Sequence, residues 1–261
     1  MPNRFLICMA LVIAASAMPA GIRAQASAKS GGAPVQSGQM PDLSGVWDRG
    51  EKATMASYAP SDPSGMKGEN PPMTPWGEAQ FKLTKPAQGI RASNHSNDTT
   101  TFQCMPPGFP RIYMEPHPMQ IFQVPGRVVM LFEFDHFFRT IYTDGRDHPK
   151  DLDPTWMGNA VGHWEGDTLV VDTVGFNDKT WIDRAGHPHS DQLHVIERIR
   201  RTDHDTLQDD ITIDDPKAYT KPWTTRKMFK LHADWELLED ICEEQGDYAN
   251  LEKQVGIEPS K

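Results

Sequence analysis

The sequence has few cysteines, no excess of basic charge and only one long apolar run, and each shortage narrows the possible functions. Its 261 residues include 26 basic and 36 acidic side chains, which gives a net charge of −10. An acidic chain without a basic cluster is a poor partner for nucleic acids or anionic membrane surfaces. We therefore expect a small-molecule ligand or substrate, no nucleic-acid partner and no membrane insertion. The oligomeric state is left open.

The only long apolar run lies at the N-terminus. Residues 1–24 contain the basic Arg4, an apolar stretch from Phe5 to Ala20 and small residues near Ala24. This is the pattern of a secretory signal peptide, and the stretch is short for a membrane-spanning helix. Residues 25–40 are rich in Ala, Ser, Gly and Gln and predict a flexible leader. The sequence thus predicts an exported protein, periplasmic or secreted.

Only Cys104 and Cys242 lie beyond the predicted signal peptide. Two cysteines far apart in an exported chain most simply form one disulfide, because the compartment is oxidising. We predict that this bond clamps the two ends of the domain together. A reactive thiol or a metal ligand remains the alternative.

The pattern from residue 119 onward favours strands. Runs of β-branched and aromatic residues alternate with short turns, which is typical of an antiparallel barrel or sandwich. We predict an all-β fold, a single antiparallel β-barrel of lipocalin-like type over residues 41–255. The Pro-rich stretch 49–100 should wrap over it, with one short helix at Pro75–Leu83 capped by Thr74. We predict about nine or ten strands. Two of them form the hairpin 160–176, and the others are 43–48, 119–124, 127–134, 138–143, 192–201, 206–213 and 223–239.

The hairpin AVGHWEGDTLVVDTVGF (160–176) carries a histidine and an aspartate. Gly166 at the first central position predicts a type II′ turn, which pairs Glu165 with Thr168. In that register His163 and Asp172 are diagonal neighbours on one face. A carboxylate beside an imidazole raises its basicity, so His163 is a candidate general base that Asp172 orients. Alternatively, this face is exposed to solvent and the pair has no function.

Two connections, 144–159 and 175–191, are unusually long for structureless loops and are rich in His, Asp and Trp. In an up-and-down barrel they flank the hairpin and should lie together over one mouth. Alternatively, the Asp-Pro and His-Pro pairs only form turns and the tryptophans close the barrel end. His148 or His189 could supply the acid, with Asp151 and Asp153 nearby; the candidate substrate-binding residues are Arg146, Trp156, Asn177, Asp178, Trp181 and His187.

Other chemistry receives less support from the sequence. His187 and His189, with His194 and His163 as further ligands, could bind a divalent metal, although Pro188 disfavours a regular strand between them. Glu197 falls on the apolar side of its strand and should pair inside the barrel with Arg139 or Arg146. The sequence contains no serine-centred elbow, phosphate-binding glycine loop or dinucleotide fingerprint. We therefore expect no organic cofactor.

Seven segments together resemble a large group of exported bacterial proteins, most of them without an assigned function. The resemblance implies a shared fold and an exported location, and it carries no catalytic residue. The tripeptide Gly45-Val46-Trp47 is also similar to the first-strand signature of lipocalin-like barrels. The segments are LSGVW (43–47), CMPPGFPR (104–111), DGRDHP (144–149), GHWEGDTLVVDTVGFND (162–178), HPHS (187–190), ERIRR (197–201) and DPKAYTKPW (215–223).

Three functions follow as hypotheses. The first is a cofactor-independent enzyme that performs acid–base chemistry (elimination, isomerisation or hydrolysis) on a small aromatic or otherwise apolar molecule. In it His163 is the base, Asp172 orients it, and His148 or His189 donates the proton. The second is a carrier that holds such a molecule in the barrel without turnover. The third is a metal-dependent hydrolase that uses the histidine cluster.

Overall fold

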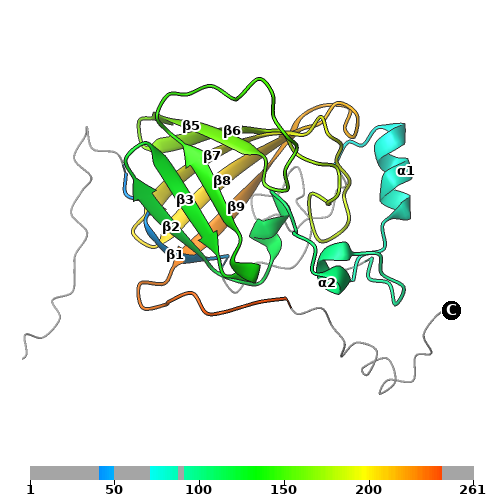
Figure 1. Cartoon of the computed structure of the whole chain (residues 1–261), viewed down its shortest axis with the longest axis horizontal. Coiled ribbons are helices and arrows are strands. Elements are labelled where there is room, and N and C mark those ends of the chain that lie inside the picture. Colours follow the sequence, from blue (N-terminus) through cyan, green and yellow to red (C-terminus); the bar gives the residue numbers. More distant parts are fainter. Residues whose placement is uncertain (1–40, 50–70, 88–90, 243–261) are drawn as a thin grey trace, which may run out of the picture. The chain divides into compact units, whose positions relative to one another are not determined.

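The computed structural model describes residues 41–49, 71–87 and 91–242. The predicted signal peptide, the leader and residues 50–70, 88–90 and 243–255 of the predicted domain, the first two of them in the Pro-rich stretch, lie outside these ranges. Nine strands close into one barrel in sequence order, and β1 pairs with β9 (Figure 1). The predicted single β-barrel is thus confirmed. The strands are β1 (Gly45–Asp48), β2 (Met119–Val124), β3 (Arg127–Phe132), β4 (Phe138–Tyr142), β5 (Asn159–Glu165), β6 (Thr168–Val174), β7 (His194–Asp203), β8 (Thr206–Asp214) and β9 (Trp223–Leu231).

The barrel departs from a purely antiparallel meander at one place. Strands β4 and β5 pair in parallel, through Ile141 with Ala160 and Tyr142 with Val161. Parallel neighbours need a crossover that returns the chain to the same end of the sheet, and residues 143–158 provide it. Strand β9 also ends earlier than predicted, at Leu231, because β8 begins at Thr206 opposite Lys230 and offers no partner further on.

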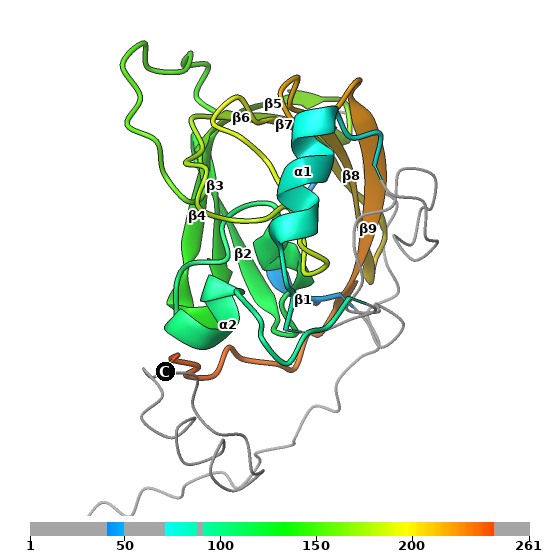
Figure 2. The same ribbon diagram turned by 90° about the vertical axis from the view of Figure 1, so that its right-hand side faces the viewer.

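The Pro-rich segment contributes a helix at one end of the barrel. Helix α1 (Pro75–Leu83) forms as predicted, because the Thr74 side chain accepts the Gly77 N–H at 3.0 Å and Pro75 opens the first turn. A Cβ on Gly77 would collide with the carbonyl oxygen of Ala218, so this glycine lets α1 approach the 215–219 turn. Figure 2 shows α1 in front of the barrel end. The other short helices are α2 (Thr99–Gln103), η1 (Arg111–Met114) and η2 (Phe134–His136). None of the helices in the described ranges is long and apolar enough to cross a membrane.

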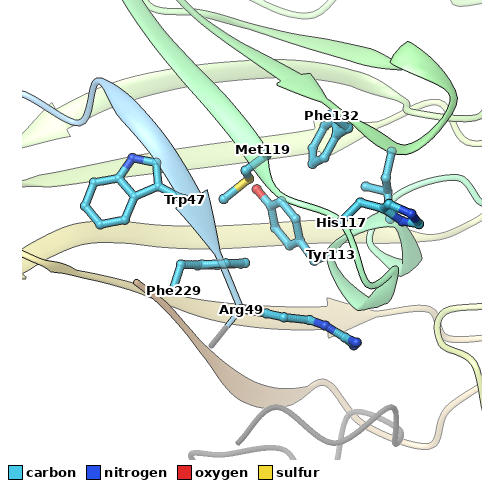
Figure 3. Close-up of a pocket in the computed structure, with 8 residues that line it drawn as sticks. Trp47, Arg49, Tyr113, His117, Met119, Phe132 and Phe229 are labelled. Carbon is cyan, nitrogen blue, oxygen red and sulfur yellow. The ribbon is translucent and has the colours of Figure 1, made fainter. Parts of the chain in front are cut away.

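Side chains fill the interior of the barrel. Element η1 brings Tyr113 between the sheet walls, where its ring centroid lies 5.3 Å from that of Phe229 and 5.9 Å from that of Phe132. Figure 3 shows Tyr113 with Trp47, Met119 and these two phenylalanines around it. The cavity at this point measures about 10 Å³, roughly the space of one water molecule. The ligand space that the sequence suggested inside the barrel is therefore occupied by η1 and its neighbours.

A charged cluster lies within this packed interior. Glu197 is fully buried and pairs with Arg139, whose Nη1 donates to its Oε1 at 2.9 Å, so the predicted inward glutamate is confirmed with Arg139 as its partner. Tyr113 donates its hydroxyl to the same oxygen at 3.1 Å. Asp209 is also buried beside Glu197, and the two acidic side chains interact through a hydrogen bond. Burial and the charge of Glu197 raise the pKa of Asp209 well above its ordinary value.

The two cysteines beyond the predicted signal peptide form the predicted disulfide. Cys104 and Cys242 are bonded with their Cα atoms 5.5 Å apart, across 138 residues of sequence. The backbone N–H of Cys242 also donates to Asp135 at 3.1 Å, and Leu238 N–H donates to Glu133 at 2.8 Å. The segment after β9 is therefore held against the turn between β3 and β4.

Candidate functional site

The hairpin at 160–176 has the predicted register but not the predicted orientation. Glu165 pairs with Thr168 and Val161 with Asp172, as expected. Leu169, Val171 and Thr173 face the interior and are fully buried, so the intervening side chains point outward. His163 is 66% exposed and its Nε2 lies 3.1 Å from Glu165. The predicted His163–Asp172 pair on the inner wall is therefore wrong.

Asp172 contacts two other histidines. Nε2 of His148 and Nε2 of His194 each lie 3.0 Å from its Oδ1, and Nδ1 of His148 lies 2.8 Å from Asn159 Oδ1. These contacts hold the first half of the 143–158 crossover against the outer faces of β5, β6 and β7. That half does not cover a barrel mouth as predicted, because its polar groups find partners on the outer wall.

Arg146, in the same half, is also remote from any cleft. Its guanidinium is half exposed, bonds Asp144 at 2.6 Å and stacks over the Tyr142 ring at 4.0 Å. Arg146 therefore has local partners on the outer surface, and the structure gives it no place in a substrate-binding site.

The second half of the crossover does meet the 175–191 connection. Thr155 N–H donates to the Gly175 carbonyl at 3.0 Å, and Asn177 N–H donates to the Thr155 carbonyl at 2.9 Å. Trp156 contributes its carbonyl to Phe109 N–H, and the Asn177 side chain accepts the Lys179 N–H at 3.1 Å. Trp156 and Asn177, two predicted binding residues, thus stabilise the loops rather than line a site.

A cleft of about 260 Å³ opens between α1, the 177–190 segment and the 215–219 turn. Three of the predicted site residues line it: Asp178, Trp181 and His189. Its walls are more polar than apolar, and they combine indole rings with amide, ammonium and carboxylate groups. The remaining lining residues are Trp76, Gln80, Leu83, Thr84, Asn97, Thr180, Pro188, Ser190 and Lys217.

A hydroxyl–imidazole pair lies in this cleft. The Thr180 Oγ1 is 2.7 Å from Nε2 of His189, and Nδ1 of His189 is 3.1 Å from the carbonyl oxygen of Ser190. A carbonyl oxygen can only accept, so Nδ1 carries the proton and Nε2 accepts the threonine hydroxyl. A hydroxyl within hydrogen-bond reach of a base that a third group orients is the arrangement of an activated nucleophile.

The surroundings of His189 keep its ring neutral. The residue is 4% exposed, and burial lowers its pKa below the ordinary value. The Ser190 carbonyl and the negative charges of Asp215 and Asp178 act in the opposite direction. A neutral imidazole with a free lone pair on Nε2 is the form that can remove a proton.

His187 has a different environment from His189. Its Nδ1 lies 2.6 Å from Asp183, and its ring stacks on Phe81 with centroids 4.5 Å apart. The described ranges contain no group of three or more histidine, cysteine or carboxylate side chains that could hold a metal ion. The predicted metal cluster is therefore not assembled, since the histidine rings bind different partners.

Segments far apart in the sequence build the cleft. A Cβ on Gly108 would lie 2.9 Å from Thr180 Oγ1, so the CMPPGFPR segment presses against the nucleophile candidate. The HPHS segment supplies His189 and Ser190, and DPKAYTKPW supplies Asp215 and Lys217. Asp178, at the end of GHWEGDTLVVDTVGFND, also lines the cleft, so four of the segments that carry the family resemblance meet at one place.

Sequence reasoning missed several residues of the site, above all Thr180, Ser190, Trp76, Lys217 and Asp215. Thr180 lies within a connection that the sequence marked as unusually long. A threonine nine residues before a histidine does not form a known catalytic motif, so the pair could not be predicted. Trp76 was assigned only to a surface helix. The density of polar residues in 175–191 was the signal that did identify the right loop.

The chain matches no protein-family model, no curated protein and no solved structure. The family resemblance seen in the sequence therefore stays a prediction.

Proposed function

We propose that the protein is an exported, cofactor-independent hydrolase in which His189 is the general base and Thr180 the nucleophile. The observation that carries this proposal is the 2.7 Å contact between the Thr180 hydroxyl and the free lone pair of His189, inside a cleft of about 260 Å³. His189 replaces His163, which the sequence had favoured. The disulfide between Cys104 and Cys242 supports export, because such bonds persist in oxidising compartments.

The reaction would proceed in two balanced steps. His189 removes the Thr180 proton while Oγ1 attacks an acyl carbon, and the imidazolium then protonates the leaving alkoxide. The same nitrogen then deprotonates a water that attacks the acyl-threonine, and the resulting imidazolium protonates the leaving Thr180 Oγ1, which releases the acid and restores the free hydroxyl and the neutral base. Among elimination, isomerisation and hydrolysis, the hydroxyl–imidazole pair favours hydrolysis of an ester, since only that reaction needs a nucleophile beside the base.

The cleft favours a polar substrate that contains a ring. Trp76 and Trp181 offer flat apolar surfaces, and Asp178 and Lys217 offer one charge of each sign. This combination suits a small ester with hydrogen-bonding groups better than the purely apolar molecule first expected. A carrier function uses the same cleft without turnover, because side chains fill the barrel interior.

An esterase assay with p-nitrophenyl acetate and with acetate esters of ring compounds that carry polar groups tests the proposal. We expect Thr180→Val and His189→Gln each to lower kcat by about 10² or more, because general base and nucleophile both act in the transition state. His163→Gln is the matched control and should leave kcat unchanged. Equal activity in all three variants would refute the assignment, whereas tight binding without product by the unmodified protein would identify a carrier.

A further inference from the structure

One buried carboxylate beside the cleft takes no direct part in the proposed hydrolysis. Asp215 is 1% exposed and accepts four hydrogen bonds. The donors include Ser190 N–H at 2.5 Å and Ser190 Oγ at 2.9 Å, from a residue 25 positions earlier. The backbone N–H groups of Lys217, at 3.1 Å, and Ala218, at 3.0 Å, complete the set.

Asp215 fixes the residue that in turn orients the base. The backbone N–H and the side-chain hydroxyl of Ser190 both donate to this one carboxylate. The carbonyl at the other side of Ser190 accepts the Nδ1–H of His189 at 3.1 Å. The Ser190 carbonyl also accepts the Leu193 N–H at 3.3 Å, so a residue bound at its amide, hydroxyl and carbonyl keeps that carbonyl directed at Nδ1 and favours the Nδ1–H tautomer of His189.

We propose that Asp215 is a positioning residue for His189, acting through Ser190 as the third member of a Thr180–His189–Asp215 site. This inference rests on the proposed function, because it gives the hydroxyl–imidazole pair the orienting and charge-stabilising partner that such pairs require. The carboxylate does not touch the imidazole. It acts at one remove, through the Ser190 backbone and through space.

The charge of Asp215 has a second effect. Burial opposes the imidazolium that forms when His189 takes the Thr180 proton, and the negative charge of Asp215 favours it. Asp178 acts in the same direction from the cleft wall, and Lys217 is the cation that lines the cleft. The third nearby carboxylate group, Asp183, is bound to His187 instead.

A purely structural role is the competing explanation, because Asp215 also holds the 215–219 turn. Imidazole ¹⁵N spectra of the full chain distinguish the positioning role from a purely structural one, because they report the tautomer and the pKa of His189 directly. They also need no substrate. In the unmodified protein we expect His189 to be protonated on Nδ1 at neutral pH. In Asp215→Asn we expect its pKa to fall and the Nε2–H tautomer to appear. His187, bound to Asp183, should give the same signal in both proteins and serves as an internal control.

Ser190→Ala should have an intermediate effect. It removes the hydroxyl bond and keeps the amide bond to Asp215, so the tautomer should persist with a pKa shift smaller than in Asp215→Asn. An Nε2–H tautomer in the unmodified protein would overturn the proposal, and so would identical His189 titrations in folded Asp215→Asn. If Asp215→Asn does not fold, the tautomer of His189 in the unmodified protein and the His189 titration in Ser190→Ala still test whether Asp215 positions His189.

Ester hydrolysis provides an independent test of the positioning role. With a hydrolysable ester, Asp215→Asn should lower kcat about tenfold or more with little change in KM, because the carboxylate does not contact the substrate. A shifted His189 titration without ester turnover by the unmodified protein would refute the proposed function and leave the positioning role standing. Full turnover in Asp215→Asn would refute the positioning role and leave the hydrolase standing.

Discussion

Gly108 and Thr180 touch across 72 residues of sequence. The backbone of Gly108 has φ +71°, and a Cβ placed on it would come within 2.9 Å of both Cγ2 and Oγ1 of Thr180. The glycine thus serves two purposes, because it permits the left-handed conformation and leaves room for the hydroxyl that His189 binds.

Gly108→Ala should therefore impair the site more than the fold. The left-handed conformation costs alanine about 1–2 kcal/mol, and the new methyl group pushes Thr180 away from His189. We expect a loss of esterase kcat well beyond that small loss of stability. Gly145→Ala is the matched control, because Gly145 has φ +83° and nothing within 4 Å of its Cβ position. Urea unfolding and kcat of both variants give the comparison, and an equal loss of kcat in the two would contradict this reading.

The contribution of Asp209 to the free energy of unfolding should decrease with rising pH. Its folded-state pKa is raised well above the value in the unfolded chain, first by burial and then by Glu197. Below its pKa in the unfolded chain, Asp209 is protonated in both states and does not change the free energy of folding with pH. As pH rises the unfolded chain loses the proton first, so about 1.4 kcal/mol of folding free energy is lost per pH unit until the folded pKa is reached.

Asp209→Asn isolates this effect. The amide has nearly the same shape and does not titrate, so the difference in unfolding free energy between the unmodified protein and the variant should decline from about pH 4 upward. Urea unfolding at several pH values measures it. A difference that stays constant, or grows with pH, would show that Asp209 is ionised in the folded protein.

Asp172 and His163 should behave differently although both lie on the outer face of the hairpin. His163→Ala removes a mostly exposed ring and should change stability by no more than about 0.5 kcal/mol. Asp172→Ala leaves His148 and His194 without their shared carboxylate and should loosen residues 143–158. Hydrogen exchange of that segment should accelerate in Asp172→Ala alone. Equal exchange in both variants would show that the carboxylate does not hold the crossover.

Local patterns determined most of the fold. Alternation and turn residues located all nine strands and the exact hairpin register, since both depend on neighbours in sequence. The helix at Pro75–Leu83 followed from Thr74 and Pro75 in the same way. Even the pairing of Cys104 with Cys242 needed only the count of cysteines and an oxidising compartment.

Only the tertiary structure decided which face of each strand is the inside and which side chains meet. Val161 and Val170 share a hairpin face with His163, yet that face is the outer wall, because Leu169 and Val171 face inward and Val170 is covered by the neighbouring strands. The filling of the barrel by η1 was equally invisible, because nothing local shows that Tyr113 enters it. Thr180, His189 and Asp215 meet because long loops fold over one barrel end, and such contacts between distant segments have no signature in the sequence.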